Sequence, residues 1–176
     1  DLVSIPMADG GEGLLDSLKL SFNAKTLSVR VNNPLMEEIE AEYAIARSRT
    51  HPGEKCALIE MARSCGLTLV GEERRNPWLT TTFGLGQMIV NALEKGCREF
   101  IVGIGGSATN DAGTGMLQAL GFDLLNADGS QIARGAIGLK ELKSISDDNV
   151  VAGLRECNFR IACDVKNPLC GDNGCS

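Results

Sequence analysis

The sequence is poor in the residues that mark several common kinds of site. It has a single histidine, His51, and aromatic residues make up only 4% of the chain. Seven cysteines are present, but their number is odd and no two of them form a Cys-x-x-Cys pair. This pattern argues against a zinc site or a disulfide framework. We therefore expect most cysteines to be small buried hydrophobic residues of a protein in the reducing cytoplasm.

Long hydrophobic runs and an excess of positive charge are also missing. No stretch approaches the roughly 20 apolar residues that a membrane helix needs. The net charge of −6 and the pI of about 4.9 argue against a general nucleic-acid or anionic-membrane surface. A small anionic substrate stays compatible, because local backbone N–H groups can outweigh the global charge. We expect small-molecule partners, no nucleic acid and no membrane, and we leave a homo-oligomer open.

The length and overall composition fit one globular domain or part of a two-domain enzyme. The chain has 176 residues, of which 43% are hydrophobic and 23% charged, as is usual for soluble domains. It opens inside an expected strand, Leu2–Ile5, and stops at Gly174–Ser176 with no closing element. We interpret it as a partial chain.

The stretch from Phe100 to Leu120 organises the rest of the sequence. The apolar run Phe100–Ile104 predicts a buried strand, which breaks at Gly105-Gly106 and restarts as a helix. Between strand and helix stand four residue types that cap helices, namely Ser107, Thr109, Asn110 and Asp111. A glycine turn from a parallel strand into a helix would present free N–H groups to a phosphate or carboxylate. A plain tight turn is the alternative.

This glycine loop matches neither of two well-known phosphate-binding motifs. It lacks the Gly-Lys-Ser/Thr of a P-loop, and Gly103-Ile-Gly105-Gly106 lacks the third glycine of a dinucleotide fingerprint.

A second glycine-rich turn lies near the start of the chain. Asp9-Gly10-Gly11 follows the expected strand, and a leucine stripe then predicts a helix through about Leu20. Asp9 at the end of a strand could ligate Mg²⁺ or orient a hydroxyl. It could equally cap the helix.

Alternating and apolar runs predict three strands in the next part of the chain. Residues 27–31 and 39–45 alternate between apolar and polar residues, which predicts a β-hairpin with one solvated face. Cys56–Met61 reads as a buried strand interrupted by Glu60. Such a carboxylate must lie at the strand end or be paired, because burying it alone is costly. Glu60 is therefore a candidate site residue.

Three threonines, Thr80, Thr81 and Thr82, precede an expected helix from about Phe83 to Lys95. Gly84 and Gly86 in its first turn lower the helix propensity, which makes sense where a ligand or another backbone approaches closely. The helix N-terminus either faces an anion or is capped by a threonine while the glycines pack against a neighbour.

The last segment combines several reactive side chains. We expect a short strand at 122–125, a turn at 126–129, and a short helix through Arg155 that Asp147 or Asp148 caps. The strand Asn158–Cys163 leads into Asp164, with Lys166 and Asn167 close behind. Asp164 could deprotonate a hydroxyl or hold Mg²⁺, Lys166 could offset phosphate charge, and Asn167 could orient the substrate. An Asx-turn at Asp164 is the alternative.

Taken together, five stretches in order resemble the bacterial glycerate kinase family of the class I type. They are Pro6–Gly13, Ile59–Ala62, Asn76–Thr82, Gly103–Asp111 and Ala162–Leu169. The resemblance implies ATP- and Mg²⁺-dependent phosphorylation of D-glycerate, with 2-phosphoglycerate favoured over 3-phosphoglycerate as product.

The resemblance also implies an α/β fold with two domains. One has Rossmann-like three-layer elements, and the other is an inserted α/β domain with a mixed sheet. Residues 1–22 would be an end fragment of the first domain and residues 23–176 mostly the second, with a return to the first near the C-terminus.

For the site, we expect Asp164 as base or Mg²⁺ ligand, with Asp9 and Asp111 as rivals and Lys166 beside them. The expected substrate- or phosphate-binding residues are Gly10, Gly11, Glu60, Thr80, Thr81, Thr82, Gly105, Gly106, Ser107, Thr109, Asn110 and Asn167. Two other functions stay open: a sugar-acid-binding module without catalysis, and an NAD(P)-dependent α/β oxidoreductase, which the missing fingerprint glycine weakens.

Overall fold

The fold is described from a computed structural model of residues 1–176. The description covers residues 10–11, 13–163, 165–172 and 174. The expected strand at 2–5 and the candidates Asp9 and Asp164 lie outside these residues.

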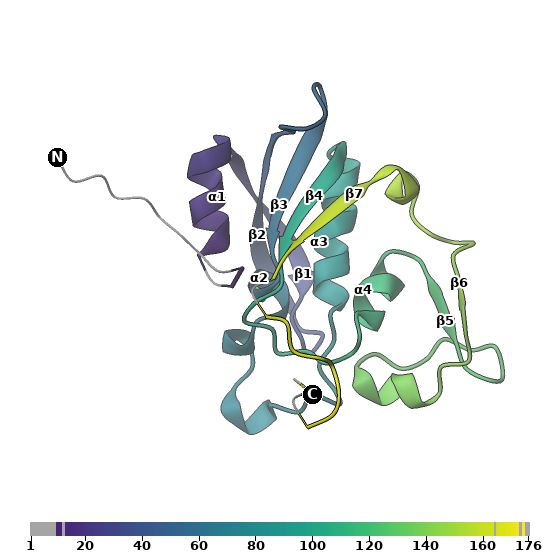
Figure 1. The fold of residues 1–176 in the computed structure, drawn as a ribbon. Coiled ribbons are helices and arrows are strands. Elements are labelled where there is room, and N and C mark those ends of the chain that lie inside the picture. Colours follow the sequence, from purple (N-terminus) through teal and green to yellow (C-terminus); the bar gives the residue numbers. More distant parts are fainter. Residues whose placement is uncertain (1–9, 12, 164, 173, 175–176) are drawn as a thin grey trace.

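A five-stranded mixed sheet forms the centre of the molecule (Figure 1). Its first two strands are an antiparallel hairpin, and its last three are parallel to one another. In spatial order the strands are β1 (Lys25–Asn32), β2 (Glu38–Arg47), β3 (Lys55–Glu60), β4 (Cys97–Gly103) and β7 (Asn158–Ala162).

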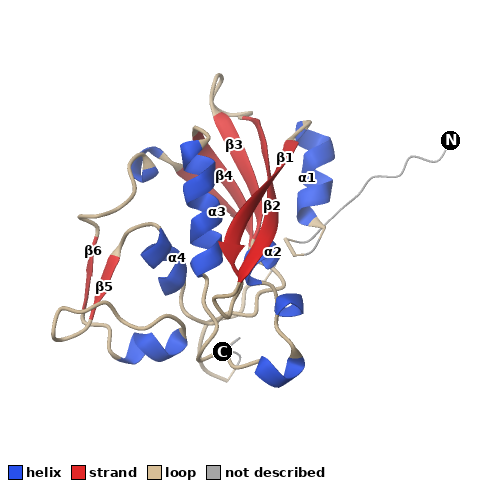
Figure 2. Ribbon diagram, turned by 180° about the vertical axis from the view of Figure 1, so that it is seen from behind, coloured by secondary structure: helices blue, strands red, loops and turns tan. Residues whose placement is uncertain are grey.

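Helices cover both faces of this sheet (Figures 1 and 2). Helix α1 (Leu14–Phe22) packs on β2 and β3, and α3 (Phe83–Glu94) packs on the opposite face against β1 and β4. The short α2 (Ala62–Cys65) follows β3, and α4 (Thr114–Ala119) packs against α3. A small separate sheet pairs β5 (Asp123–Leu125) with β6 (Ser144–Ser146), and four 3₁₀ turns span Leu67–Leu69, Glu72–Arg74, Ala136–Lys140 and Leu154–Glu156.

The alternation of residues along the strands produces two hydrophobic clusters, one on each face. Tyr43, Ile59 and Phe100 are buried against α3. Leu58 and Cys56 point to the other face, where Leu15 of α1 covers them. The burial of these apolar side chains holds the three layers together.

The structure confirms the predicted mixed α/β fold, the hairpin and the helix at 83–94. The helix expected after Gly105-Gly106 is α4, which begins at Thr114 after the irregular loop 104–113. One local expectation is wrong. Asp147 and Asp148 cap no helix, because their carboxylates bind Arg155 and Ser146 and the turn Leu154–Glu156 begins after Gly153.

No helix among the described residues is both long and apolar enough to cross a membrane.

Candidate active site

Three predicted motifs meet because three parallel strands end side by side. Glu60 at the end of β3 is paired with Gly103 at the end of β4. Gly103 is in turn paired with Ala162 at the end of β7. The carboxyl ends of parallel strands are the usual place for ligand sites in α/β folds. The motifs at 59–62, 103–111 and 162–169 therefore all leave the sheet at this edge.

The glycine-rich turn before α1 packs against the same edge. The N–H of Gly105 donates to the carbonyl of Gly10 at 3.0 Å. A Cβ atom at Gly105 would lie only 2.7 Å from the nitrogen of Gly11. Both stretches need glycine here because their backbones are in direct contact.

The loop 104–113 is held by an adjoining segment at 65–67. The N–H of Ala108 donates to the carbonyl of Cys65 at 2.8 Å, and Leu67 N–H donates to the carbonyl of Gly106 at 2.9 Å. The hydroxyls of Ser107 and Thr109 lie 2.7 Å apart, and Thr109 N–H donates to Ser107 Oγ at 3.0 Å. Several donors that the sequence offered to a ligand are thus bonded within the chain.

Asp111 lies where the N-termini of two helices converge. Its side chain is buried, with 1% of the residue exposed. Oδ2 accepts hydrogen bonds from the N–H and hydroxyl of Thr82 at 2.8 and 2.9 Å, from the Thr81 hydroxyl at 3.3 Å, and from Gly115 N–H at 3.1 Å. Oδ1 accepts from Gly113 N–H at 3.1 Å. One carboxylate thus caps both α3 and α4.

This arrangement accounts for the three consecutive threonines. Thr81 and Thr82 bind the Asp111 carboxylate, and Thr80 donates its hydroxyl to the carbonyl of Ala108 at 2.8 Å. All three threonines are buried. The anion at the N-terminus of α3 is therefore a side chain of the protein, and the threonines tie this helix to the loop.

Like Asp111, Glu60 is a buried carboxylate that binds the N-terminus of a helix, here α1 on the other face of the sheet. It is 1% exposed, and its Oε2 accepts the N–H of Leu15 in the first turn of α1 at 3.2 Å. Its Oε1 lies 3.9 Å from Nε of Arg63. The expectation that this buried charge lies at a strand end or is paired is confirmed, and both are true of Glu60. Glu60 and Arg63 border a cavity of about 760 Å³ that also includes Glu40 and Glu42.

A larger groove of about 1080 Å³ opens between the loop 104–113, α3, α4 and β7. Its polar end contains Thr80 and Thr82 together with Ser107, Thr109, Asn110 and Asp111. Its other walls are apolar, with Ile89, Met116, Phe159 and Ile161 among them. The groove thus collects the predicted residues of two motifs that lie far apart in the sequence.

Arg75 also lines this groove, and the sequence analysis missed it. It is the one basic residue among the described lining residues, and its side chain is 41% exposed. Its Nε donates to the carbonyl of Val70 at 3.3 Å. Arg75 directly precedes Asn76-Pro77, which opens one of the five stretches that resemble the family, and this position is the signal in the sequence that could have identified it.

The remaining candidates lie at the surface. Lys166 and Asn167 are exposed and follow β7 along the sheet edge. Among the described residues no three His, Cys, Asp or Glu side chains are grouped as a metal site. Asp111 does not fit a Mg²⁺ ligand, because both of its oxygens are engaged by protein donors.

Comparison with known proteins agrees with this arrangement. The whole chain, residues 1–176, matches the Glycerate kinase family. The chain belongs to the glycerate kinase family. Its mixed sheet is therefore that of a member of this family rather than of a dinucleotide-binding oxidoreductase.

Individual relatives match over nearly the whole chain. A glycerate kinase from Halalkalibacterium halodurans is 45% identical over 97% of this chain, and the glycerate 2-kinase of Escherichia coli is 44% identical over 99%. These matches cover 43% and 44% of the relatives, so the chain spans less than half of their length. A crystal structure described as a glycerate kinase 2 from Salmonella typhimurium LT2 superposes with a TM-score of 0.87, at 42% identity, over 97% of this chain and 44% of that one.

Proposed function

We propose that the chain forms part of a cytoplasmic enzyme that transfers a phosphoryl group from ATP to D-glycerate. The observation that carries the proposal is the match to proteins named as glycerate kinases over 97–99% of this chain. One of these relatives is named a glycerate 2-kinase, which supports 2-phosphoglycerate as the product. Neither a sugar-acid-binding module nor an oxidoreductase has a specific observation in its favour.

The groove supplies what phosphoryl transfer requires of a protein. Catalysis of this reaction depends mainly on positioning and on neutralising negative charge. The hydroxyls of Ser107 and Thr109 line the polar end of the groove, and Arg75, whose Nη1 lies 3.8 Å from Oε1 of Glu72, adds a basic side chain to the lining. We assign Arg75 to binding of the anionic substrates.

Asp111 fits a positioning part better than that of a base. A base must reach the substrate hydroxyl with a free carboxylate oxygen. Both oxygens of Asp111 accept hydrogen bonds from backbone N–H groups of the protein. We therefore assign Asp111 to holding the loop 104–113 against α3, and keep Asp164, with Asp9 as its rival, as the predicted base or Mg²⁺ ligand. Lys166 stays a predicted catalytic residue beside them, and Gly105, Gly106 and Asn167 stay predicted binding residues. The division into two domains at residue 22 also stays a prediction.

A coupled assay of ADP release tests the proposal. D-glycerate and MgATP would be added to the 176-residue chain, and in parallel to a grafted chain. In the grafted chain, residues 1–176 replace the matching segment of E. coli glycerate 2-kinase, which is 44% identical. We expect ADP release by the grafted chain with D-glycerate and none with 3-hydroxypropanoate, which lacks the C2 hydroxyl that would accept the phosphoryl group.

The product is identified by adding enolase without a phosphoglycerate mutase. Only 2-phosphoglycerate is dehydrated to phosphoenolpyruvate, which is followed by its ultraviolet absorbance. ADP release without this absorbance would correct the product to 3-phosphoglycerate. A folded grafted chain that binds D-glycerate and releases no ADP would overturn the kinase proposal.

A further inference from the structure

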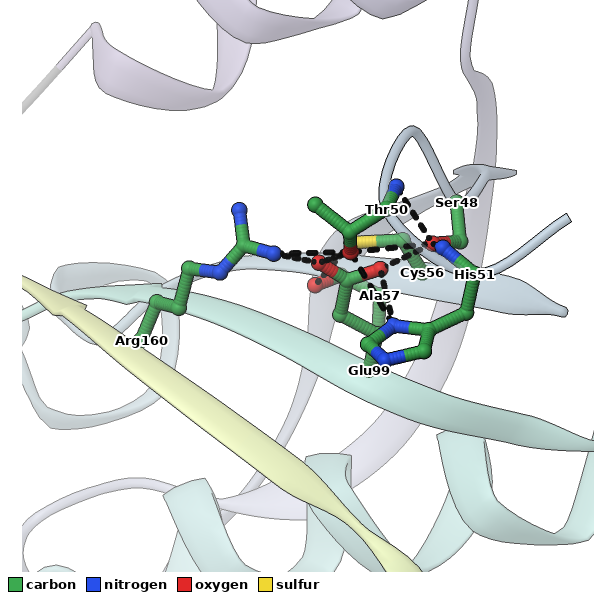
Figure 3. Close-up of polar contacts among 7 residues, drawn as sticks. All are labelled: Ser48, Thr50, His51, Cys56, Ala57, Glu99 and Arg160. Carbon is green, nitrogen blue, oxygen red and sulfur yellow. Dashed lines mark hydrogen bonds and ion pairs between the residues drawn. The ribbon is translucent and has the colours of Figure 1, made fainter.

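A buried carboxylate far from the groove joins three separate elements. Glu99 lies near the start of β4, and its side chain is 2% exposed. Its Oε1 lies 2.5 Å from Nη2 of Arg160 on β7 and accepts the Thr50 hydroxyl at 3.0 Å. Its Oε2 accepts the hydroxyl of Ser48, from the loop between β2 and β3. Figure 3 shows these side chains converging on Glu99.

The charge of Glu99 is stabilised by these partners. Burial by itself would raise the pKa of its carboxyl group. The hydrogen bonds from Ser48 and Thr50 and the positive charge of Arg160 outweigh burial, so the pKa lies below its ordinary value. Arg160 also donates to the Thr50 hydroxyl at 2.8 Å, which closes the network.

Strand β7 has few other attachments. Among the described residues it is an edge strand of the sheet that pairs with β4 alone, and most of its residues are exposed. On the face opposite Glu99, Phe159 stacks on Phe100 with ring centroids 4.6 Å apart. A ring stack thus holds one face of β7, and the ion pair of Arg160 with Glu99, together with its hydrogen bond to Thr50, holds the other.

The register of β7 decides where the following segment lies. A slip of one residue would exchange the faces of Phe159 and Arg160, and a slip of two would displace the strand end by about 6–7 Å. Ala162 at this end accepts the N–H of Ile104 at 3.3 Å and leads into the segment 163–167 with its predicted catalytic residues.

We propose that the ion pair between Glu99 and Arg160 fixes the register in which β7 pairs with β4, and we call this pair the register lock. The two residues thereby act as positioning residues for the reaction at the opposite end of the strand. This inference rests on the proposed kinase function for its kinetic consequence. Displacing a reacting group by about 1 Å can lower a rate by 10²-fold. The lock therefore affects turnover more than substrate affinity, because the polar residues that line the groove belong to other elements, and β7 contributes only the apolar side chains of Phe159 and Ile161.

The test uses Glu99→Gln and Arg160→Gln in the grafted chain. We expect kcat to fall at least 10-fold in both variants while the KM values for ATP and D-glycerate stay within about 3-fold. Arg160→Lys, which keeps the charge, is expected to recover most of the turnover. Arg155→Gln is the matched control, because it breaks an exposed ion pair with Asp147 at 2.5 Å and leaves β7 untouched.

Hydrogen exchange measured by mass spectrometry provides a readout that does not depend on activity. The peptide spanning 158–167 is expected to exchange faster in both Gln variants, while α3 keeps its wild-type protection. Wild-type kcat in both variants, or faster exchange throughout the chain, would overturn the register lock. If the unmodified grafted chain releases no ADP, the kinase proposal fails, and the exchange measurement still decides the lock.

Discussion

At the scale of single residues, three buried carboxylates each bind hydrogen-bond donors or arginines of the protein. Asp111, Glu60 and Glu99 are each at most 2% exposed. Their partners are helix N-termini, hydroxyl groups and arginines. A buried charge is tolerated only when such partners replace the lost water, so each carboxylate joins segments that are distant in sequence.

Replacing Asp111 with alanine is expected to destabilise the fold strongly. The change leaves the N–H groups of Thr82 and Gly115 buried, and that of Gly113 partly buried, without their acceptor. We expect the free energy of unfolding to fall by about 3–5 kcal/mol, as measured by urea denaturation followed by circular dichroism. Asp147→Ala, which removes an exposed ion pair with Arg155, is the control and should cost less than about 1 kcal/mol. Equal losses in the two variants would contradict the capping interpretation.

The neighbouring residues Arg74 and Arg75 offer a matched pair for the groove. Arg75 lines the groove, whereas Arg74 forms an ion pair with Glu37 at 2.7 Å outside it. In the grafted chain, Arg75→Met is expected to raise the KM of an anionic substrate by about 10-fold, a loss of roughly 1.4 kcal/mol of binding. Arg74→Met should leave the KM values unchanged. Steady-state kinetics with MgATP and D-glycerate measure both, and similar KM values in the two variants would exclude Arg75 from binding.

At the scale of elements, close packing of α3 explains two glycines that are costly in a helix: Gly86 faces α4, and Gly84 faces the carbonyl of Asn32 at the end of β1. Gly84 and Gly86 lie in the first turn of α3 and are both buried. A Cβ at Gly86 would lie 2.5 Å from the carbonyl oxygen of Met116 and 2.6 Å from Cβ of Ala119. Of the two reasons offered by the sequence, the structure shows the close approach of another backbone. This contact places α4, and with it one wall of the groove.

Gly86→Ala should therefore destabilise the protein even though alanine favours helices. The gain in helix propensity is about 1 kcal/mol, whereas forcing the two helices apart costs about 1–3 kcal/mol. We expect a net decrease in the melting temperature, measured by differential scanning calorimetry. Glu94→Ala at the exposed end of the same helix gains propensity without a clash and should not lower it. A stabilised Gly86→Ala variant would show that the helices separate at no cost.

At the scale of the whole molecule, the exposure of the cysteine thiols distinguishes the buried core from the accessible surface. Cys56, Cys65 and Cys97 are buried, whereas Cys163 and Cys170 are exposed. Burial raises the pKa of Cys56 to about 12 and the pKa values of Cys65 and Cys97 to about 11. Because the thiolate is the reactive form, the buried thiols are protected by both access and ionisation.

Alkylation with iodoacetamide at pH 8 should separate these two groups. In the native chain we expect Cys163 and Cys170 to be modified within minutes, and the three buried cysteines to react only after urea is added. Peptide mass spectrometry identifies each site. Labelling of Cys56 at the rate of Cys163 in the absence of urea would show that the sheet opens under native conditions.

The sequence by itself determined the elements whose pattern is local. Alternation predicted the hairpin of residues 27–31 and 39–45, the 3.6-residue period predicted α1 and α3, and Gly96 marked the end of α3. The ordered motifs indicated the family, because side-chain and glycine patterns of this kind are written directly in the chain. The resemblance to that family implied the mixed α/β fold.

Only the tertiary structure decided what the polar residues of those motifs contact. Sequence patterns marked Asp111 and Thr80–Thr82 as anion-related, but not that the carboxylate and the threonines bind each other. Nothing in the sequence joined Glu99 to Arg160, because that pairing depends on which strands are neighbours and in which register. Local periodicity contains no information on long-range strand order, since the same alternation fits any partner. For that reason the sequence by itself did not predict the groove, whose walls come from segments that only the fold brings together.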